Sequence, residues 1–173
     1  MTDITERFND RLAVRLLSPT WDRVYLRAFG DDYPDGTDTN GFYSRTTLDR
    51  LSSALRLGPG RTLVDLGCGH GGPGLWVARQ TGADLTGIDI SDVGVASACE
   101  RAAPSGLGDP ARFQVGDLMA AQLHDACCDA VLSLDVLIFV PDKAAAVREC
   151  ARILRVVRET DRGINDAPRA SPG

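Results

Sequence analysis

The stretch that decides the fold runs from residue 63 to residue 74 and reads Leu63-Val64-Asp65-Leu66-Gly67-Cys68-Gly69-His70-Gly71-Gly72-Pro73-Gly74. Its apolar start predicts a buried strand. A glycine-dense turn follows, and glycine permits positive φ angles and close approach of a ligand to the backbone. Pro73 suits the first position of a helix, where the missing N–H costs nothing. A strand, a glycine turn and a helix N-terminus in this order are typical of a nucleotide-type cofactor site at the carboxyl end of a parallel sheet.

Downstream of this turn, segments typical of strands alternate with segments typical of helices. We expect strands at 84–90, 111–117 and 129–135, and helices at 75–81, 93–103 and 141–154. This alternation indicates βαβ units, whose right-handed crossovers bring all strand carboxyl ends to one edge. Four acids lie at or near those ends: Asp65, Asp89, Asp117 and Asp135. Four carboxylates in one crevice repel each other unless they contact donors or a cation.

Upstream of the turn, residues 1–58 are expected to form helices and loops. Apolar spacing predicts helices near 8–17, 24–29 and 48–57, with Thr20 as a possible N-cap of the second and a loop over 30–41. This region holds most of the aromatic side chains of the chain: Phe8, Trp21, Tyr25, Phe29, Tyr33, Phe42 and Tyr43. Two interpretations stay open. The aromatic residues either pack small helices against the sheet, or line a lid over a small organic substrate.

Composition narrows the class of protein. The chain has 173 residues, which favours one domain, and a net charge of −5 without a basic cluster, which disfavours a nucleic-acid partner. It has no apolar run long enough to span a bilayer, so no membrane partner is expected, and its start lacks the pattern of a secretory signal. The five cysteines have no metal-ligand spacing, so we expect free thiols and no metal. These features together predict a cytoplasmic protein.

Two nucleotide-type ligands compete for the glycine turn. Gly67, Gly69 and Gly72 satisfy G-x-G-x-x-G, and Asp89 follows at the distance expected for dinucleotide binding. Asp65 counts against that ligand, because a carboxylate lowers the potential where a dianionic pyrophosphate must bind. S-adenosylmethionine has no phosphate and carries a sulfonium and an ammonium. Asp65 therefore favours the methyl donor.

The segment from about residue 42 to residue 154 resembles the class I S-adenosylmethionine-dependent methyltransferases, especially their small-molecule branch. The matching elements, in order, are residues 64–71, 87–91, 115–118 and 129–133 through 151–154. The resemblance implies an α/β fold, with a Rossmann-like parallel sheet and flanking helices. It implies methyl transfer to a small organic molecule. It also implies a cofactor site made by Asp65, Gly67, Cys68, Gly69, Asp89, Ile90, Asp117, Leu118 and Ser133.

The resemblance also implies a role for several of these residues. Asp65 would hold the methionine ammonium, and Gly67 and Gly69 would let the backbone lie against the amino-acid part of the cofactor. Asp89 would accept both ribose hydroxyls, and Asp117 would accept from the adenine amino group. Ser133 or the Leu134 backbone would close the methionine side. The resemblance identifies no catalytic residue: His70 is expected to be structural or next to the cofactor, and Asp135 and Tyr43 are possible substrate contacts.

The pattern of the family is expected to stop near Leu154. We divide the chain into a helical lid or substrate region (1–58), a cofactor-binding core (59–154) and a tail expected to be disordered (155–173). The last strands of the family fold would then be missing, and the strand at 129–135 would be an exposed edge capable of self-association. The alternative functions are a non-catalytic S-adenosylmethionine-binding remnant or interaction subunit, and an NAD-dependent oxidoreductase.

Overall fold

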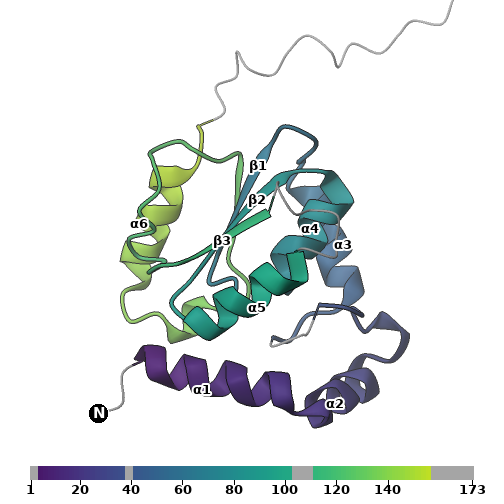
Figure 1. The fold of residues 1–173 in the computed structure, drawn as a ribbon. Helices are drawn as coiled ribbons and strands as arrows, with labels where there is room; N and C mark the ends of the chain where they lie inside the picture. The colour runs from purple at the N-terminus through teal and green to yellow at the C-terminus, as the bar shows by residue number, and fades with distance from the viewer. Residues whose placement is uncertain (1–3, 38–40, 103–110, 157–173) are drawn as a thin grey trace, which may run out of the picture.

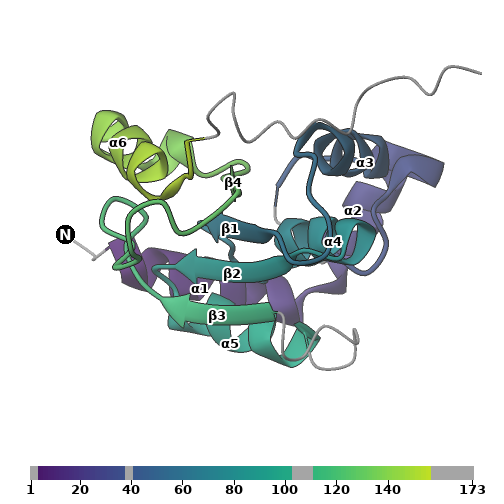
Figure 2. The ribbon, with the colours of Figure 1, turned by 90° about the horizontal axis from the view of Figure 1, so that it is seen from above.

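The computed structural model describes residues 4–37, 41–102 and 111–156. Its centre is a four-stranded parallel sheet with the strand order β3-β2-β1-β4 (Figures 1 and 2). The strands are β1 (Thr62–Leu66), β2 (Asp84–Asp89), β3 (Ala111–Val115) and β4 (Ala130–Leu132). Helices α4 (Gly72–Thr81) and α5 (Asp92–Ala102) connect the first three strands, and α6 (Lys143–Ile153) follows β4. The predicted Rossmann-like arrangement is therefore confirmed.

The two faces of the sheet bury different sets of side chains, because successive residues of a strand point to opposite faces. Leu63 and Leu85 pack with α4 residues in one apolar cluster, which Leu51 and Leu55 of the α3 segment also contact. Val64, Leu66 and Ile88 pack with Ile153 of α6 in the other. Helices α3 (Arg45–Ala54), α4 and α5 thus cover one face and α6 the other, as Figure 1 shows. By this alternation Asp65 belongs to the face covered by α4.

Several predicted boundaries shift. The fourth strand was expected over 129–135 but pairs only over Ala130–Leu132, and the chain turns through a left-handed residue at Asp135 (φ 58°). The 3₁₀ helix η3 (Leu137–Phe139) follows. Thr20 is not an N-cap, because α2 (Pro19–Phe29) begins two residues earlier than such a cap requires, with Ser18 at the N-cap position. Part of the predicted 30–41 loop is the 3₁₀ helix η1 (Gly30–Asp32).

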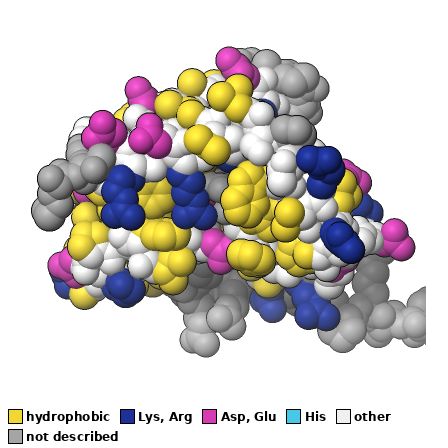
Figure 3. Space-filling view, turned by 90° about the horizontal axis from the view of Figure 1, so that it is seen from below, with side chains coloured by type: hydrophobic (Ala, Val, Ile, Leu, Met, Phe, Trp, Pro, Cys, Tyr) yellow, Lys and Arg dark blue, Asp and Glu magenta, His cyan; other side chains and the backbone are white. Residues whose placement is uncertain are grey.

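Helix α1 (Ile4–Leu17) and α2 lie together at the lower side of the molecule in Figure 1. Leu12 of α1 is buried and reaches Gly94 of α5, where an added Cβ would lie 2.9 Å from its Cδ1. Leu17 and Trp21 are exposed instead. Figure 3 views the molecule from this side and shows hydrophobic side chains interspersed with arginines. None of the helices in the described ranges has the length and apolar character needed to cross a membrane.

The amino-terminal end of the sheet is held by Asp129. Its carboxylate accepts from the Thr62 N–H at 2.8 Å and forms ion pairs with Arg61 and Arg155 at 3.0 and 2.9 Å. The Arg155 N–H also donates to the Cys128 carbonyl, beside a parallel bridge between Cys128 and Leu154. Arg155, with which the predicted tail begins, is thus bonded to the residues around β4, and the disorder of the rest of the tail stays a prediction. Residues 157–173 lie outside the described residues.

Candidate cofactor site

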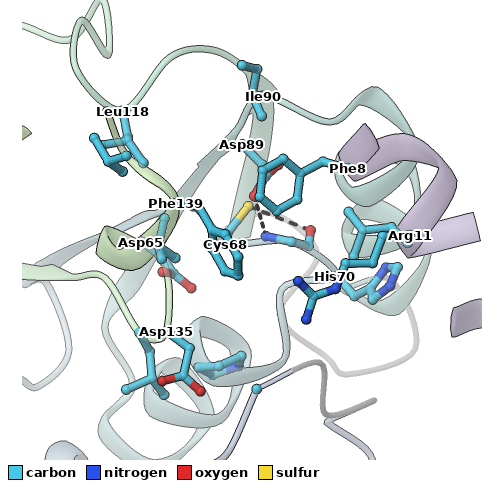
Figure 4. A pocket seen from close by; sticks show the side chains of 18 of the residues that line it. Phe8, Arg11, Asp65, Cys68, His70, Asp89, Ile90, Leu118, Asp135 and Phe139 are labelled. Atoms are coloured by element: carbon cyan, nitrogen blue, oxygen red, sulfur yellow. Dashed lines mark hydrogen bonds between the residues drawn. The ribbon is translucent and has the colours of Figure 1, made fainter. Parts of the chain in front are cut away.

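A cavity of about 210 Å³ opens at the carboxyl end of the sheet, where the sequence predicted a crevice. The glycine turn after β1, the end of β2 and the segment after β3 form its floor. Helix α1, the segment around Tyr43 and the chain from Leu134 to Pro141 contribute the remaining walls. Of the predicted cofactor residues, the cavity lining includes all but one: Asp65, Gly67, Cys68, Gly69, Asp89, Ile90, Asp117 and Leu118. Figure 4 labels the side chains of five of them around the cavity: Asp65, Cys68, Asp89, Ile90 and Leu118.

Ser133 is the predicted residue that does not line the cavity. Its hydroxyl donates to the Leu66 carbonyl at 2.9 Å and so ties β4 to β1. The adjacent Leu134, whose backbone was the alternative to Ser133 in the prediction, does line the cavity.

The glycine turn is fixed by contacts within the chain. Gly67, Gly69 and Gly71 all have positive φ angles (80°, 51° and 78°), which explains why glycines alternate there. At Gly67 a Cβ would also lie 2.6 Å from both methyl groups of Val136. Helix α4 then begins at Gly72, so Pro73 occupies the second helical position instead of the predicted first one.

The N–H groups of the turn are largely occupied. Gly67 and Cys68 both donate to the Ile88 carbonyl, at 2.7 and 3.1 Å, and Gly71 donates to the Cys68 carbonyl at 2.8 Å. Gly69 donates to Asp89 Oδ2 at 2.7 Å, as a dashed line in Figure 4 marks. A dinucleotide site needs such N–H groups for its pyrophosphate. Here the cavity is lined instead by glycines of the turn, Gly67 and Gly69, and by the neighbouring carboxyl groups of Asp65 and Asp89.

Asp65 is the most unusual group in the site. Its side chain is 2% exposed, and its Oδ2 atom accepts no hydrogen bond from the described residues. Burial first, and then the charge of Asp89, raise the pKa of Asp65 to about 7, while the backbone N–H of Gly74 lowers it in part. A Cβ at Gly74 would lie 2.7 Å from Oδ2, so α4 can pass this carboxyl group only with glycine there. A buried acid with an unused acceptor is costly unless a ligand supplies a donor or a positive charge.

Asp89 and Asp117 combine local and site roles. Asp89 accepts from the N–H groups of Gly69 and Ser91, and burial raises its pKa despite these bonds. Asp117 lies two residues beyond β3 and accepts from the Met119 N–H at 2.8 Å. Each carboxylate still has lone pairs directed elsewhere, because two oxygens offer about four acceptor positions.

Several residues that line the cavity lie outside the predicted cofactor residues. Phe8 of α1 contacts Phe139 of η3 edge-to-face, with ring centroids 5.3 Å apart, and the Arg11 guanidinium lies 5.4 Å from the Phe139 ring centre. Helix spacing signalled that Phe8 and Leu12 share a face, but no pattern indicated Arg11, Val136 or Phe139. The other aromatic residues of the N-terminal region split: Tyr43 lines the cavity, whereas Tyr25 contacts Trp21, Phe29 and Phe42. Packing among helices therefore accounts for Tyr25 and its neighbours, while the lid over a substrate stays a prediction for the residues that line the cavity.

His70 is buried in the lining of the cavity, and His124 is exposed. The five cysteines are free, and burial is the main cause that raises the pKa of the Cys68 thiol. Among the residues that the structure describes, His, Cys, Asp and Glu form no group of three placed to hold a metal ion.

Comparison with known proteins agrees with this geometry. Residues 64–156 match the family described as a methyltransferase domain, and the chain belongs to that family. It is 34% identical over 140 residues to 27-O-demethylrifamycin SV methyltransferase of Amycolatopsis mediterranei, covering 81% of this chain and 50% of that protein. The chain spans about half the length of the curated relatives it matches.

Solved structures extend the comparison. A geranyl diphosphate methyltransferase in complex with S-adenosylmethionine aligns with a TM-score of 0.61 at 28% identity, covering 64% of this chain and 45% of that one. The [4+2]-cyclase SpnF aligns with a TM-score of 0.57 at 34% identity, covering 64% of this chain and 42% of that one. Because a protein named as a cyclase shares this fold, the fold alone does not decide the reaction, and the residues of the site determine it.

Proposed function

We propose that this chain binds S-adenosylmethionine in the cavity and takes part in transferring its methyl group to a small, largely apolar organic molecule. The observation that carries the proposal is the buried Asp65 carboxyl group, which lines the cavity and whose Oδ2 atom has no hydrogen-bond partner among the described residues. A cationic ligand in the cavity would stabilise the ionised form of this carboxyl group. A pyrophosphate would meet the like charges of Asp65 and Asp89 and would find four N–H groups of the turn already bonded.

The remaining cofactor roles are assigned by position. Gly67 and Gly69 would let the backbone lie against the methionine part, with Cys68 in the floor. Asp89, at the end of β2, would accept the ribose hydroxyls. Ile90 and Leu118 would contact the adenine, and Asp117 would accept from its amino group. The family similarity and the shared cavity support these assignments.

The bound donor supplies a methyl group already activated by its positively charged sulfur. The protein must therefore orient the acceptor atom, the methyl and the sulfur in line, and orientation alone is worth on the order of 7–11 kcal/mol in favourable intramolecular cases. As the new bond to the methyl carbon forms, the carbon–sulfur bond breaks and its electrons remain on sulfur, leaving neutral S-adenosylhomocysteine. If the acceptor carries a proton, a base must receive it. We assign no residue to that role.

The walls beyond the glycine turn favour an apolar acceptor. Phe8, Val136, Phe139 and Val140 line that side of the cavity, with the Tyr43 ring beside them. The names of the relatives, which include a rifamycin methyltransferase and a geranyl diphosphate methyltransferase, are consistent with an organic acceptor of this kind.

The test is a calorimetric titration with S-adenosylhomocysteine and, separately, with NAD, on the wild type and on Asp89→Ala. We expect saturable binding of S-adenosylhomocysteine alone and a weaker affinity in the variant. Binding of NAD without S-adenosylhomocysteine would refute the proposal, and equal affinities would refute the role of Asp89. A methyl-transfer assay with candidate acceptors then separates the two remaining functions, because tight binding without turnover indicates a binding subunit.

We further propose a cytoplasmic location, which the five free cysteines support, since reducing compartments keep thiols unpaired. We also propose that the chain can self-associate through β4, which is last in the strand order. Analytical ultracentrifugation showing a monomer at all concentrations would contradict the second proposal.

A further inference from the structure

Asp135 has a backbone conformation that calls for an explanation. It is one of the few described non-glycine residues with a positive φ angle, 58°, and it follows directly on the segment that leaves β4. Aspartate tolerates this left-handed conformation better than most residues, but such positions still carry strain. The conformation places the side chain in the cavity lining (Figure 4).

The carboxylate of Asp135 reaches a distant part of the chain. Its Oδ2 atom accepts from the backbone N–H of Phe42 at 2.6 Å. The neighbouring Gly41 fits tightly against the same group, because a Cβ there would lie 2.5 Å from Asp135 Oδ2 and 2.9 Å from the Tyr43 ring. Asp135, Gly41 and Tyr43 are therefore packed against one another at the cavity wall.

Tyr43 follows directly on the residue that makes this contact. It is 5% exposed and lines the cavity, whereas the adjacent Phe42 side chain is 81% exposed. Burial raises the pKa of Tyr43, and the charges of Asp65 and Asp135 raise it further, so its ring stands near both acids. The Asp135 carboxylate holds this segment through its hydrogen bond with the Phe42 N–H, which lies between Gly41 and Tyr43 in the chain.

We propose that Asp135 is a positioning residue whose carboxylate holds the Gly41–Tyr43 segment against the end of β4 and thereby fixes Tyr43 in the wall of the cavity. It acts through the backbone of residue 42 and not on a reacting atom. This inference rests on the proposed function in one respect, the identity of the ligand that the wall encloses. The contact between Asp135 and Phe42 itself exists without a ligand.

The first experiment needs no ligand. Hydrogen exchange of the Phe42 amide is measured on the full chain. The wild type should show protection, which Asp135→Gly should lose by about tenfold or more, because a hydrogen bond to a charged acceptor is worth that much. Glycine suits a positive φ, so this variant removes the carboxylate without adding backbone strain. Asp135→Asn keeps an acceptor and tolerates the conformation, and it should retain most of the protection.

The second experiment separates positioning from catalysis. Phe42→Pro removes the N–H donor and leaves Asp135 intact, and Phe42→Ala controls for the lost ring. If Asp135 positions the wall, Asp135→Gly and Phe42→Pro weaken S-adenosylhomocysteine binding by a similar factor, about tenfold, while Asp135→Asn and Phe42→Ala stay within about threefold. The proposal is overturned if the exchange rate of the Phe42 amide is the same in Asp135→Gly as in the wild type. It is also overturned if Asp135→Asn loses methyl transfer while Phe42→Pro keeps it. Absence of cofactor binding in the wild type would instead refute the proposed function and leave the exchange result standing.

Discussion

The affinity for S-adenosylhomocysteine should fall below neutral pH, and Asp65 should set the pH at which it falls. The raised pKa, about 7, means that the buried carboxyl group is neutral in mildly acidic solution. Only the ionised form can pair with the ammonium group of the ligand. Below pH 7 binding must therefore release a proton, and the dissociation constant should rise about tenfold for each pH unit, reaching roughly a hundredfold at pH 5.

The same pKa has the opposite effect on the ligand-free protein. Between its ordinary pKa of 3.8 and about 7, Asp65 binds more protons in the folded chain than in the unfolded one. The free energy of unfolding should therefore fall as the pH rises through this window, by ~4 kcal/mol at ~1.4 kcal/mol per unit, and should not change with this group above it. A carboxyl group paired in the folded state would show the reverse dependence.

Asp65→Asn is the matched perturbation. At pH 8 the ligand-free variant should unfold at a higher temperature than the wild type, because a buried charge is removed, and the difference should vanish near pH 4. Its affinity for S-adenosylhomocysteine should be weak and insensitive to pH from 5 to 8. Calorimetry in buffers of different ionisation enthalpy measures affinity and proton release together. If wild type and variant show the same pH slope, the reasoning about Asp65 is wrong.

Three further variants test other contacts. Gly74→Ala should lower the free energy of unfolding by about 1–3 kcal/mol, measured by urea denaturation, because its Cβ would press on Asp65 Oδ2; a neutral effect would show that α4 can shift. Asp89→Asn should weaken binding of S-adenosylhomocysteine less than Asp89→Ala, because asparagine keeps one acceptor for the N–H groups of the turn. Equal losses of affinity, measured by calorimetry, would show that the ribose contact and not the bond to the turn determines the affinity. Glu149→Ala should cost about 2 kcal/mol, because the buried Ala121 N–H loses its acceptor at 2.8 Å, while the affinity for S-adenosylhomocysteine stays unchanged; a parallel loss of affinity would contradict that separation.

Local patterns were sufficient to predict the sheet. The strand starting before Asp65 and the turn after it are encoded by neighbouring residues, so their positions agree with the structure to within a residue or two. The predicted fourth strand was too long because its apolar residues continue to Leu134, and hydrophobicity alone cannot show where the pairing with β1 stops. The pairing stops at Leu132, three residues before the left-handed turn at Asp135.

The part of the cavity around the glycine turn was predictable for the same reason, since Asp65, Gly67 and Asp89 lie at or next to strand ends. The other walls were not. Phe8 and Phe139 meet across a long stretch of sequence, and the bond from the Phe42 N–H to Asp135 joins residues 93 positions apart. Such pairings depend on the tertiary arrangement of α1 and η3, which no local periodicity encodes.

The two ends of the sheet differ in how their buried or half-buried acids are neutralised. At one end a single acid, Asp129, is neutralised by Arg61 and Arg155 and fastens three segments of the chain. At the other end Asp65 is buried, and its Oδ2 atom accepts no hydrogen bond from the part of the chain that the structure describes. Substitutions that reinforce the first end can therefore raise the melting temperature without touching ligand recognition. Neutralising Asp65 at the second end is expected to raise the melting temperature and, if the proposed function holds, to weaken ligand binding.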